Sequence, residues 1–176
     1  EQDRYKTAKT VIHTLADIVS KNGNLLLNIP VRGDGSIDEK ERAVVEDIAE
    51  WMQINQEAIY ASRPWKIFGE GPAISNAATQ GRKDFNEGKG KPLTAEDIRF
   101  TTKGPFLYAI VLGWPANNMV HIKQLRIDAG RIHSVQLLGS TSPLHLSQSA
   151  DGLIVNLPSE PPCKHAFVLK MTLPAS

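Results

Sequence analysis

The chain has 176 residues, of which 41% are hydrophobic and 22% are charged, a balance that is typical of globular proteins and excludes wholesale disorder. Twenty Lys and Arg against nineteen Asp and Glu leave a formal net charge of +1, so no basic excess favours nucleic acid as a partner. The single cysteine, Cys163, excludes an internal disulfide framework and a zinc site built from several cysteines. The apolar runs are far shorter than the roughly 20 residues that cross a bilayer, so we expect no membrane association.

The first 62 residues show helical periodicity on both sides of one short apolar segment. Residues 3–21 carry an apolar stripe at spacings of three and four, which predicts a helix. Residues 24–29 are apolar at consecutive positions, as in a strand of a parallel sheet that is covered on both faces. Asp38 is a suitable N-cap for a second helix over about 39–60. Helix, buried strand, loop and helix form an incomplete α/β unit, so we expect a fragment whose upstream part is missing.

The rest of the chain has short alternating segments separated by Gly and Pro. Residues 69–96 hold five glycines and many charges, and we expect a long loop there. The segments with strand character that follow are 98–102, 106–113, 119–125, 132–138, 144–147, 153–157 and 166–173. Turns at intervals of about 8–12 residues, without helices between them, predict an antiparallel β-sandwich.

A group of polar residues follows the predicted buried strand. Asn28, Arg32 and Asp34 lie at or just after its C-terminal end, the edge at which α/β barrels build their active sites. We therefore take these three residues as candidates for the rim of a pocket. In the alternative interpretation, Asn28 fixes loop backbone and residues 33–35 are only a turn.

Other chemistry-bearing residues give weaker signals. Trp114 lies at a strand end and could stack on a sugar ring, although packing within the domain is the alternative. The five histidines lack the spacing that directs two rings at one metal, and no phosphate-binding or nucleophile motif occurs, so we expect neither metal nor cofactor. Cys163 is interpreted as a loop cysteine without a function.

Several stretches, in chain order, resemble the α-L-fucosidases of glycoside hydrolase family 29. They are residues 17–29 (DIVSKNGNLLLNI), 33–37 (GDGSI), 57–65 (EAIYASRPW), 98–104 (IRFTTKG) and 107–115 (LYAIVLGWP). The resemblance implies an α+β fragment: the last α/β unit of a catalytic (β/α) barrel over 1–62, a linker over 63–96 and a C-terminal antiparallel β-sandwich over 97–176. This chain has Ile29-Pro30-Val31 where the family often has Ile-Gly-Pro, so the family's rim loop is not carried over.

The resemblance also implies an activity. Its members hydrolyse terminal α-linked L-fucose with retention, using an Asp nucleophile and an acid/base residue that is usually Glu. Both residues lie upstream in the family, so the resemblance implies that this chain holds no catalytic residue and is inactive alone. In that case the sandwich is structural. The alternative is a carbohydrate-binding β-sandwich module of another glycoside hydrolase.

The same resemblance suggests partners for this chain. They are the upstream catalytic barrel and, through it, fucosylated glycans, in a parent protein that is secreted, periplasmic or lysosomal. Burying one leucine contributes ~1.5–3 kcal/mol, so exposure of the leucine run at 25–27 is unfavourable. We therefore expect residues 1–60 to pack differently from the parent barrel, to self-associate, or to lie against a barrel supplied by another chain.

Overall fold

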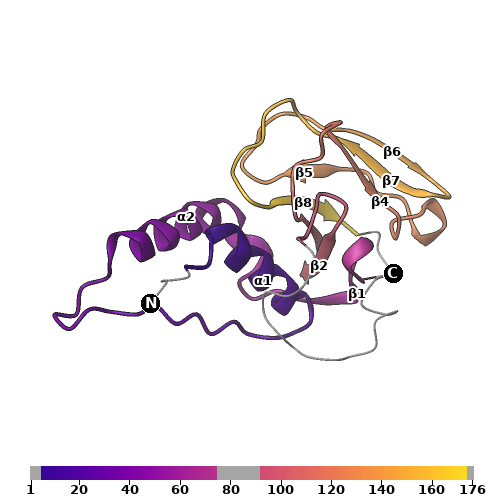
Figure 1. Cartoon of the computed structure of the whole chain (residues 1–176). Coiled ribbons are helices and arrows are strands. Elements are labelled where there is room, and N and C mark those ends of the chain that lie inside the picture. Colours follow the sequence, from indigo (N-terminus) through magenta and orange to yellow (C-terminus); the bar gives the residue numbers. More distant parts are fainter. Residues whose placement is uncertain (1–4, 75–91, 174–176) are drawn as a thin grey trace.

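The computed structural model describes residues 5–74 and 92–173, and it places two helices beside two antiparallel sheets (Figure 1). The helical elements with both ends in the described residues are α1 (Ala8–Ser20), α2 (Glu39–Asn55), and the 3-10 turns η1 (Gln56–Ala58) and η2 (Ile127–Ala129), and residues 72–74 are also helical. The strands are β1 (Arg63–Glu70), β2 (Ile98–Lys103), β3 (Phe106–Val111), β4 (Met119–Ile122), β5 (Val135–Leu137), β6 (His145–Ser149), β7 (Gly152–Asn156) and β8 (Phe167–Thr172). Within the described ranges, no helix has both the length and the apolar character needed to span a membrane.

The strands form the antiparallel sandwich that the sequence predicts. One sheet has the order β1-β2-β3-β8-β5 and the other has the order β4-β7-β6. Every strand pair formed by the described residues is antiparallel. A core that includes Phe100, Leu107, Leu153 and Leu169 fills the space between the sheets. The smaller sheet follows the expected alternation, since β4 and β7 bury alternate side chains and expose the others.

The larger sheet is buried on both faces, because α1 and α2 cover the side that faces away from the sandwich core. In β3, Leu107 and Ala109 point into the sandwich, whereas Tyr108 and Ile110 belong to a second core that includes Ile12 of α1 and Trp51 of α2. This arrangement explains the uninterrupted apolar run in β3, which is typical of a strand covered on both faces. The chain thus has three layers, with the five-stranded sheet in the middle.

Both helices begin at capping residues. Asp38 caps α2 as predicted, and its carboxylate accepts hydrogen bonds from the N–H groups of Lys40 at 2.8 Å and Glu41 at 3.0 Å. The first helix is shorter than the expected range 3–21, because Thr7 caps it by accepting a hydrogen bond from Thr10 N at 3.2 Å. The second expected helix, 39–60, ends at Asn55 and continues as the 3-10 turn η1.

The strand predicted over residues 24–29 is not present, so this expectation is corrected. Residues 24–29 form neither strand nor helix and connect α1 to α2 on the surface, with Leu26 93% and Leu27 40% exposed. The physical reason is that a strand needs a neighbouring backbone to pair its N–H and C=O groups. None of the described strands pairs with this segment.

A second correction concerns the expected linker over 63–96. Its first part is strand β1, which pairs with β2 at the edge of the larger sheet, with Arg63 opposite Thr102 and Gly69 opposite Arg99. Pro64 and Gly69 suggested a loop, but an edge strand tolerates proline, and the register shifts between these two residues, as in a bulge. The part of the expected loop at 75–91 lies outside the described residues.

Candidate functional site

The three rim candidates lie on the exposed segment between α1 and α2. Asn28, Arg32 and Asp34 are all exposed. Asp34 Oδ1 accepts hydrogen bonds from Ser36 N at 2.9 Å and Ser36 Oγ at 2.7 Å, and these bonds hold the pKa of Asp34 below its ordinary value. Arg32 N donates to Ser36 O at 2.8 Å. The structure therefore brings Arg32 and Asp34 into one turn, while Asn28 lies before it on the extended segment.

Trp114 is engaged in packing inside the sandwich. Its ring contacts Phe167 edge-to-face, with 4.7 Å between ring centroids, and its Nε1 donates a hydrogen bond to Asn118 Oδ1 at 2.8 Å. Such a geometry is the one expected for a tryptophan that stabilises the domain. A role in sugar stacking therefore has no geometric support beyond the position of Trp114 at a strand end.

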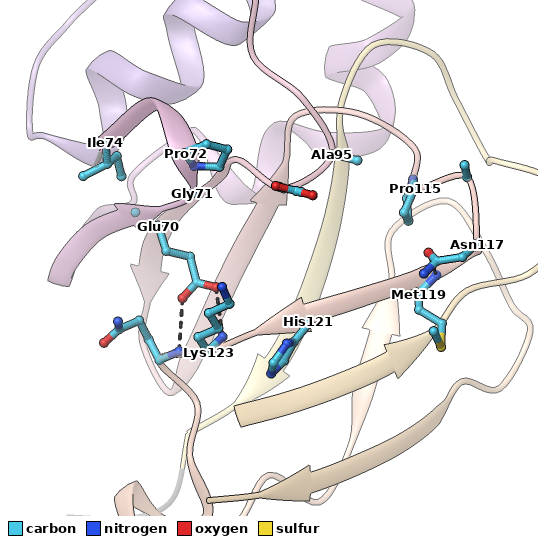
Figure 2. A pocket seen from close by; sticks show the side chains of 14 residues that line it. Glu70, Gly71, Pro72, Ile74, Ala95, Pro115, Asn117, Met119, His121 and Lys123 are labelled. Carbon is cyan, nitrogen blue, oxygen red and sulfur yellow. Dashed lines mark hydrogen bonds between the residues drawn. The ribbon is translucent and has the colours of Figure 1, made fainter. Parts of the chain in front are cut away.

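A cavity of about 980 Å³ lies where the end of β1 meets the loop after β3 and strand β4. Figure 2 shows Glu70 turned toward the backbone at Lys123, with His121 beside it. The Glu70 carboxylate accepts hydrogen bonds from Lys123 N at 2.9 Å and Gln124 N at 3.1 Å. Burial raises the pKa of Glu70, against the opposing effect of these two bonds. His121 Nε2 is hydrogen-bonded to Asp151 O at 2.9 Å.

The contacts of Glu70 show that it has a structural role in this cavity. Each carboxylate oxygen accepts one backbone N–H, so Glu70 ties the turn after β4 to the end of β1. The sequence reasoning missed this residue, although Gly69 and Gly71 flank it. The two glycines are the sequence signal that could have marked the site, because Gly71 has φ 124° and an added Cβ there would come within 2.6 Å of Asp97.

Two ionic clusters connect the helical layer to the sheet. Arg99 Nε of β2 and Lys21 Nζ each approach the Asp17 carboxylate of α1 to 2.6 Å. Burial alone would raise the pKa of Asp17, but the hydrogen bonds from Lys21 and Arg99 hold it below its ordinary value. Arg99 is only 3% exposed, so this ion pair connects a buried cation of the sandwich to the first helix.

The second cluster is centred on Glu57 of η1. Lys170 of β8 forms an ion pair with Glu57 Oε1, and the Tyr108 hydroxyl of β3 donates to the same oxygen at 2.6 Å. These two bonds lower the pKa of Glu57. Burial and the bond to Glu57 raise the pKa of Tyr108. Both clusters use their charges to hold elements together, which differs from a pair of carboxylates that flank a sugar ring.

Metal ligation has no support in the part of the chain that the structure describes. No group of three or more His, Cys, Asp and Glu residues in residues 5–74 and 92–173 could hold a metal ion. The carboxylates of Asp17, Glu57 and Glu70 are committed to basic groups or backbone N–H groups.

Comparison with known proteins shows which proteins this chain resembles. The α-L-fucosidase family model matches residues 1–57, and the model of the α-L-fucosidase C-terminal domain matches residues 91–172. Tissue alpha-L-fucosidase of Mus musculus is 31% identical over 167 residues, which are 92% of this chain and 32% of the mouse protein. An alpha-L-fucosidase of Branchiostoma floridae is 28% identical over 172 residues, which are 95% of this chain and 33% of that protein.

Solved structures agree with the sequence comparison. Alpha-L-fucosidase isoenzyme 1 from Paenibacillus thiaminolyticus matches with a TM-score of 0.71 and 26% identity, over 98% of this chain and 36% of that one. The Thermotoga maritima alpha-fucosidase in complex with a mechanism based inhibitor shares the fold with a TM-score of 0.74 and 23% identity, over 98% of this chain and 35% of that one. The chain spans about a third of the length of the curated relatives it matches. Because the two family models match in order along the chain, it belongs to the α-L-fucosidase family and corresponds to the C-terminal portion of those proteins.

Proposed function

We propose that this chain is the C-terminal part of a retaining α-L-fucosidase that releases terminal α-linked L-fucose from glycans. The observation that supports the proposal is the ordered match of residues 1–57 to the α-L-fucosidase family and of residues 91–172 to its C-terminal domain. In this proposal the nucleophile and the acid/base residue lie upstream. The carboxylates in the described residues that are held by ion pairs or backbone bonds then have structural roles.

In the proposed enzyme, the sandwich supports the last elements of the catalytic barrel. The Asp17–Arg99 and Glu57–Lys170 pairs hold α1 and η1 against the sheet. The segment between α1 and α2 then presents Asn28, Arg32 and Asp34 at the rim of the fucose pocket. These residues contribute to substrate binding and have no role in bond cleavage.

The exposed leucine segment is the proposed contact with the upstream barrel. Leu26 is 93% exposed and Val31 is 63% exposed, although both side chains are apolar. Contact with barrel strands would cover these side chains and pair the backbone of residues 24–29. Without that barrel, the same segment makes the chain prone to self-association.

Hydrolysis of an aryl α-L-fucoside tests the activity and its location. We expect turnover by the full-length protein, with the α-anomer of fucose as the first product in NMR spectra, and no turnover by residues 1–176 alone. Turnover of the 176-residue chain at rates typical of enzymes would overturn the location of the catalytic residues, and a full-length protein that is inactive on α-fucosides would overturn the activity.

Substitutions in the exposed turn test the rim. Arg32→Ala is expected to raise the KM of the full-length protein with little change in kcat, because the proposed role is binding. Arg126→Ala is the matched control, since Arg126 is also exposed and its ion pair with Asp128 lies in the sandwich. Equal kinetic parameters for both variants and the parent protein would remove Arg32 from the proposed rim.

A further inference from the structure

The cavity between the end of β1 and strand β4 lies outside both hydrophobic cores, since none of the residues that line it belongs to either core. Met119 and His121 of β4 line it and are exposed, whereas Val120 between them is buried in the sandwich. The cavity is therefore open to the outer face of the smaller sheet. Its volume of about 980 Å³ is at the upper end of the range for ligand pockets, about 300–1,000 Å³, so a short oligomer can enter.

Three polar side chains in the cavity are fixed by backbone hydrogen bonds that leave part of their bonding capacity unused. Figure 2 shows Glu70 on one side of the cavity and Asn117 on the other, with His121 between them. Glu70 accepts one backbone N–H on each carboxylate oxygen, and each oxygen keeps a second lone pair. Asn117 Oδ1 accepts from Met119 N at 3.1 Å, so Asn117 Nδ2 remains a donor. His121 Nε2 donates to Asp151 O at 2.9 Å, because a carbonyl oxygen only accepts, and the neutral ring therefore presents Nδ1 as an acceptor.

The backbone around these side chains is held in place by further contacts. In the turn before β4, Asn118 N donates to Pro115 O at 3.0 Å, and Trp114 Nε1 donates to Asn118 Oδ1 at 2.8 Å. Gly152, with φ 129°, leaves room for the ring of His121, because an added Cβ would lie 3.0 Å from His121 Nε2. Binding to groups that are already fixed loses little side-chain entropy, which favours a specific ligand.

The charged groups of the cavity favour a neutral ligand. The carboxylates of Glu70 and Glu96 and the ammonium group of Lys123 line the same space, together with His121. An anionic ligand would face two carboxylates and a cationic ligand would face the lysine, so either charge meets repulsion. A ligand without net charge avoids both and can still use these groups as hydrogen-bond partners.

Sugar hydroxyls match the unused groups, because a hydroxyl both donates and accepts. Hydroxyls of a sugar can donate to Glu70 and His121 and accept from Asn117. Met119 is 45% exposed and supplies an apolar contact for the C–H groups of a sugar ring. Ile154 of β7 lies opposite His121 and is 37% exposed, so the apolar surface continues beyond the cavity across the outer face. Fixed polar groups beside an apolar strip suit a chain of sugar rings.

We propose that this cavity binds a short neutral oligosaccharide, held by hydrogen bonds to Glu70, Asn117 and His121. The inference rests on the proposed function, because the glycans that carry fucose are the neutral oligosaccharides that a fucosidase meets. Binding in the cavity involves no covalent step. Its effect is to give the full-length protein a second contact with a branched glycan, which slows dissociation of that glycan.

Saturation-transfer difference NMR on the 176-residue chain tests the site, because the method observes the ligand and tolerates self-associated protein. The probes are lactose, its neutral derivative fucosyllactose and its anionic derivative sialyllactose. We expect saturable binding of both neutral sugars and weaker binding of sialyllactose. Absence of saturable binding for lactose, or tighter binding of sialyllactose than of lactose, would overturn the proposal.

Variants locate the binding. His121→Ala removes one acceptor, so we expect the dissociation constant for lactose to rise about fivefold, as for the loss of one neutral hydrogen bond. Ala116→Trp, at an exposed position that lines the cavity, should fill the space and abolish binding. His133→Ala is the matched control, because His133 is also exposed and does not line the cavity. Unchanged binding in Ala116→Trp, or an equal loss in the control, contradicts the site, and Ala116→Trp decides the matter if His121→Ala does not fold.

The site and the activity of the parent protein can fail separately. Lactose binding by this chain requires no turnover, so an inactive full-length protein would remove the fucosidase activity and leave the site in place. Turnover of an aryl α-L-fucoside by the full-length protein, together with no lactose binding by this chain, would remove only the site.

Discussion

The buried ion pair between Asp17 and Arg99 allows a quantitative prediction. Asp17→Asn removes the carboxylate that lies 2.6 Å from Arg99 Nε and leaves a guanidinium that is 3% exposed, with a remaining bond to Ile98 O at 3.1 Å. Removing one partner of a buried pair costs about 3–5 kcal/mol, because the other charge stays buried without compensation. For a domain of this size, that loss corresponds to a decrease in Tm of roughly 6–20 °C.

Urea denaturation of four proteins tests this magnitude: the parent chain, Asp17→Asn, Arg99→Met and the double variant. Arg99→Met is expected to cost less than Asp17→Asn, because Asp17 keeps Lys21 and some solvent exposure. The double variant should be less destabilised than the sum of the single variants. Asp128→Asn is the control, since its pair with Arg126 is exposed on both sides and such pairs contribute about 0–1 kcal/mol.

The same pair predicts a dependence on pH. Folding lowers the pKa of Asp17, so its contribution is fully present above the pKa of the unfolded chain, about 4, and is lost as pH falls through the lower folded value. Stability of the parent chain should therefore decrease more steeply below pH 4 than that of Asp17→Asn. A loss for Asp17→Asn no greater than that for Asp128→Asn, or parallel acid profiles, would refute the reasoning.

Two further substitutions address packing and exposure. Trp51→Phe removes the Nε1–H that donates to Ala166 O at 2.7 Å and leaves this carbonyl oxygen with only the weak bond from Cys163 Sγ at 3.4 Å. We therefore expect a loss of about 1–3 kcal/mol in urea denaturation, and an unchanged midpoint would contradict the importance of the tryptophan bond. Leu26→Glu replaces a side chain that is 93% exposed, so we expect the free energy of unfolding to change by less than about 0.5 kcal/mol and self-association, measured by light scattering, to decrease. Ile132→Glu, at a position that is 2% exposed, is the contrasting variant and should strongly lower the free energy of unfolding. A strictly monomeric parent chain would contradict the prediction that Leu26 promotes self-association.

The sandwich could be predicted from the sequence because its signals are local. Turn residues separate segments of alternating or continuous apolar character, and each predicted segment overlaps one strand of the structure, as 106–113 contains β3. The cap of α2 at Asp38 was also predictable, since an aspartate before a helical pattern satisfies free N–H groups at short range. Strand β1 was missed because its proline and its glycine, Gly69, are typical of loops, and only its pairing with β2 makes it a strand.

In the candidate site, too, local contacts could be predicted from the sequence and long-range contacts could not. The turn around Asp34 depends on residues two positions apart, so its composition predicts it. In contrast, Glu70 is 53 residues from Lys123, and Asp47 is 118 residues from His165. No local pattern encodes such contacts, because the fold brings the partners together. The leucine run at 25–27 is an intermediate case: its pattern is that of a buried strand, but the described residues do not supply the neighbours that would make it one.

The middle sheet determines how the two parts of the chain depend on each other. Its face toward the helices carries Tyr108, Ile110, Leu112 and Val168, which are all 0% exposed only because α1 and α2 cover them. Exposing such side chains costs about 1.5–3 kcal/mol each, which together approaches the whole stability of an ordinary domain. The helices that the family resemblance assigns to the catalytic barrel are therefore also part of the core of the sandwich. A change in the docking of α1 can then reach the exposed turn around Asp34, because residues 21–33 connect the end of that helix directly to Asp34.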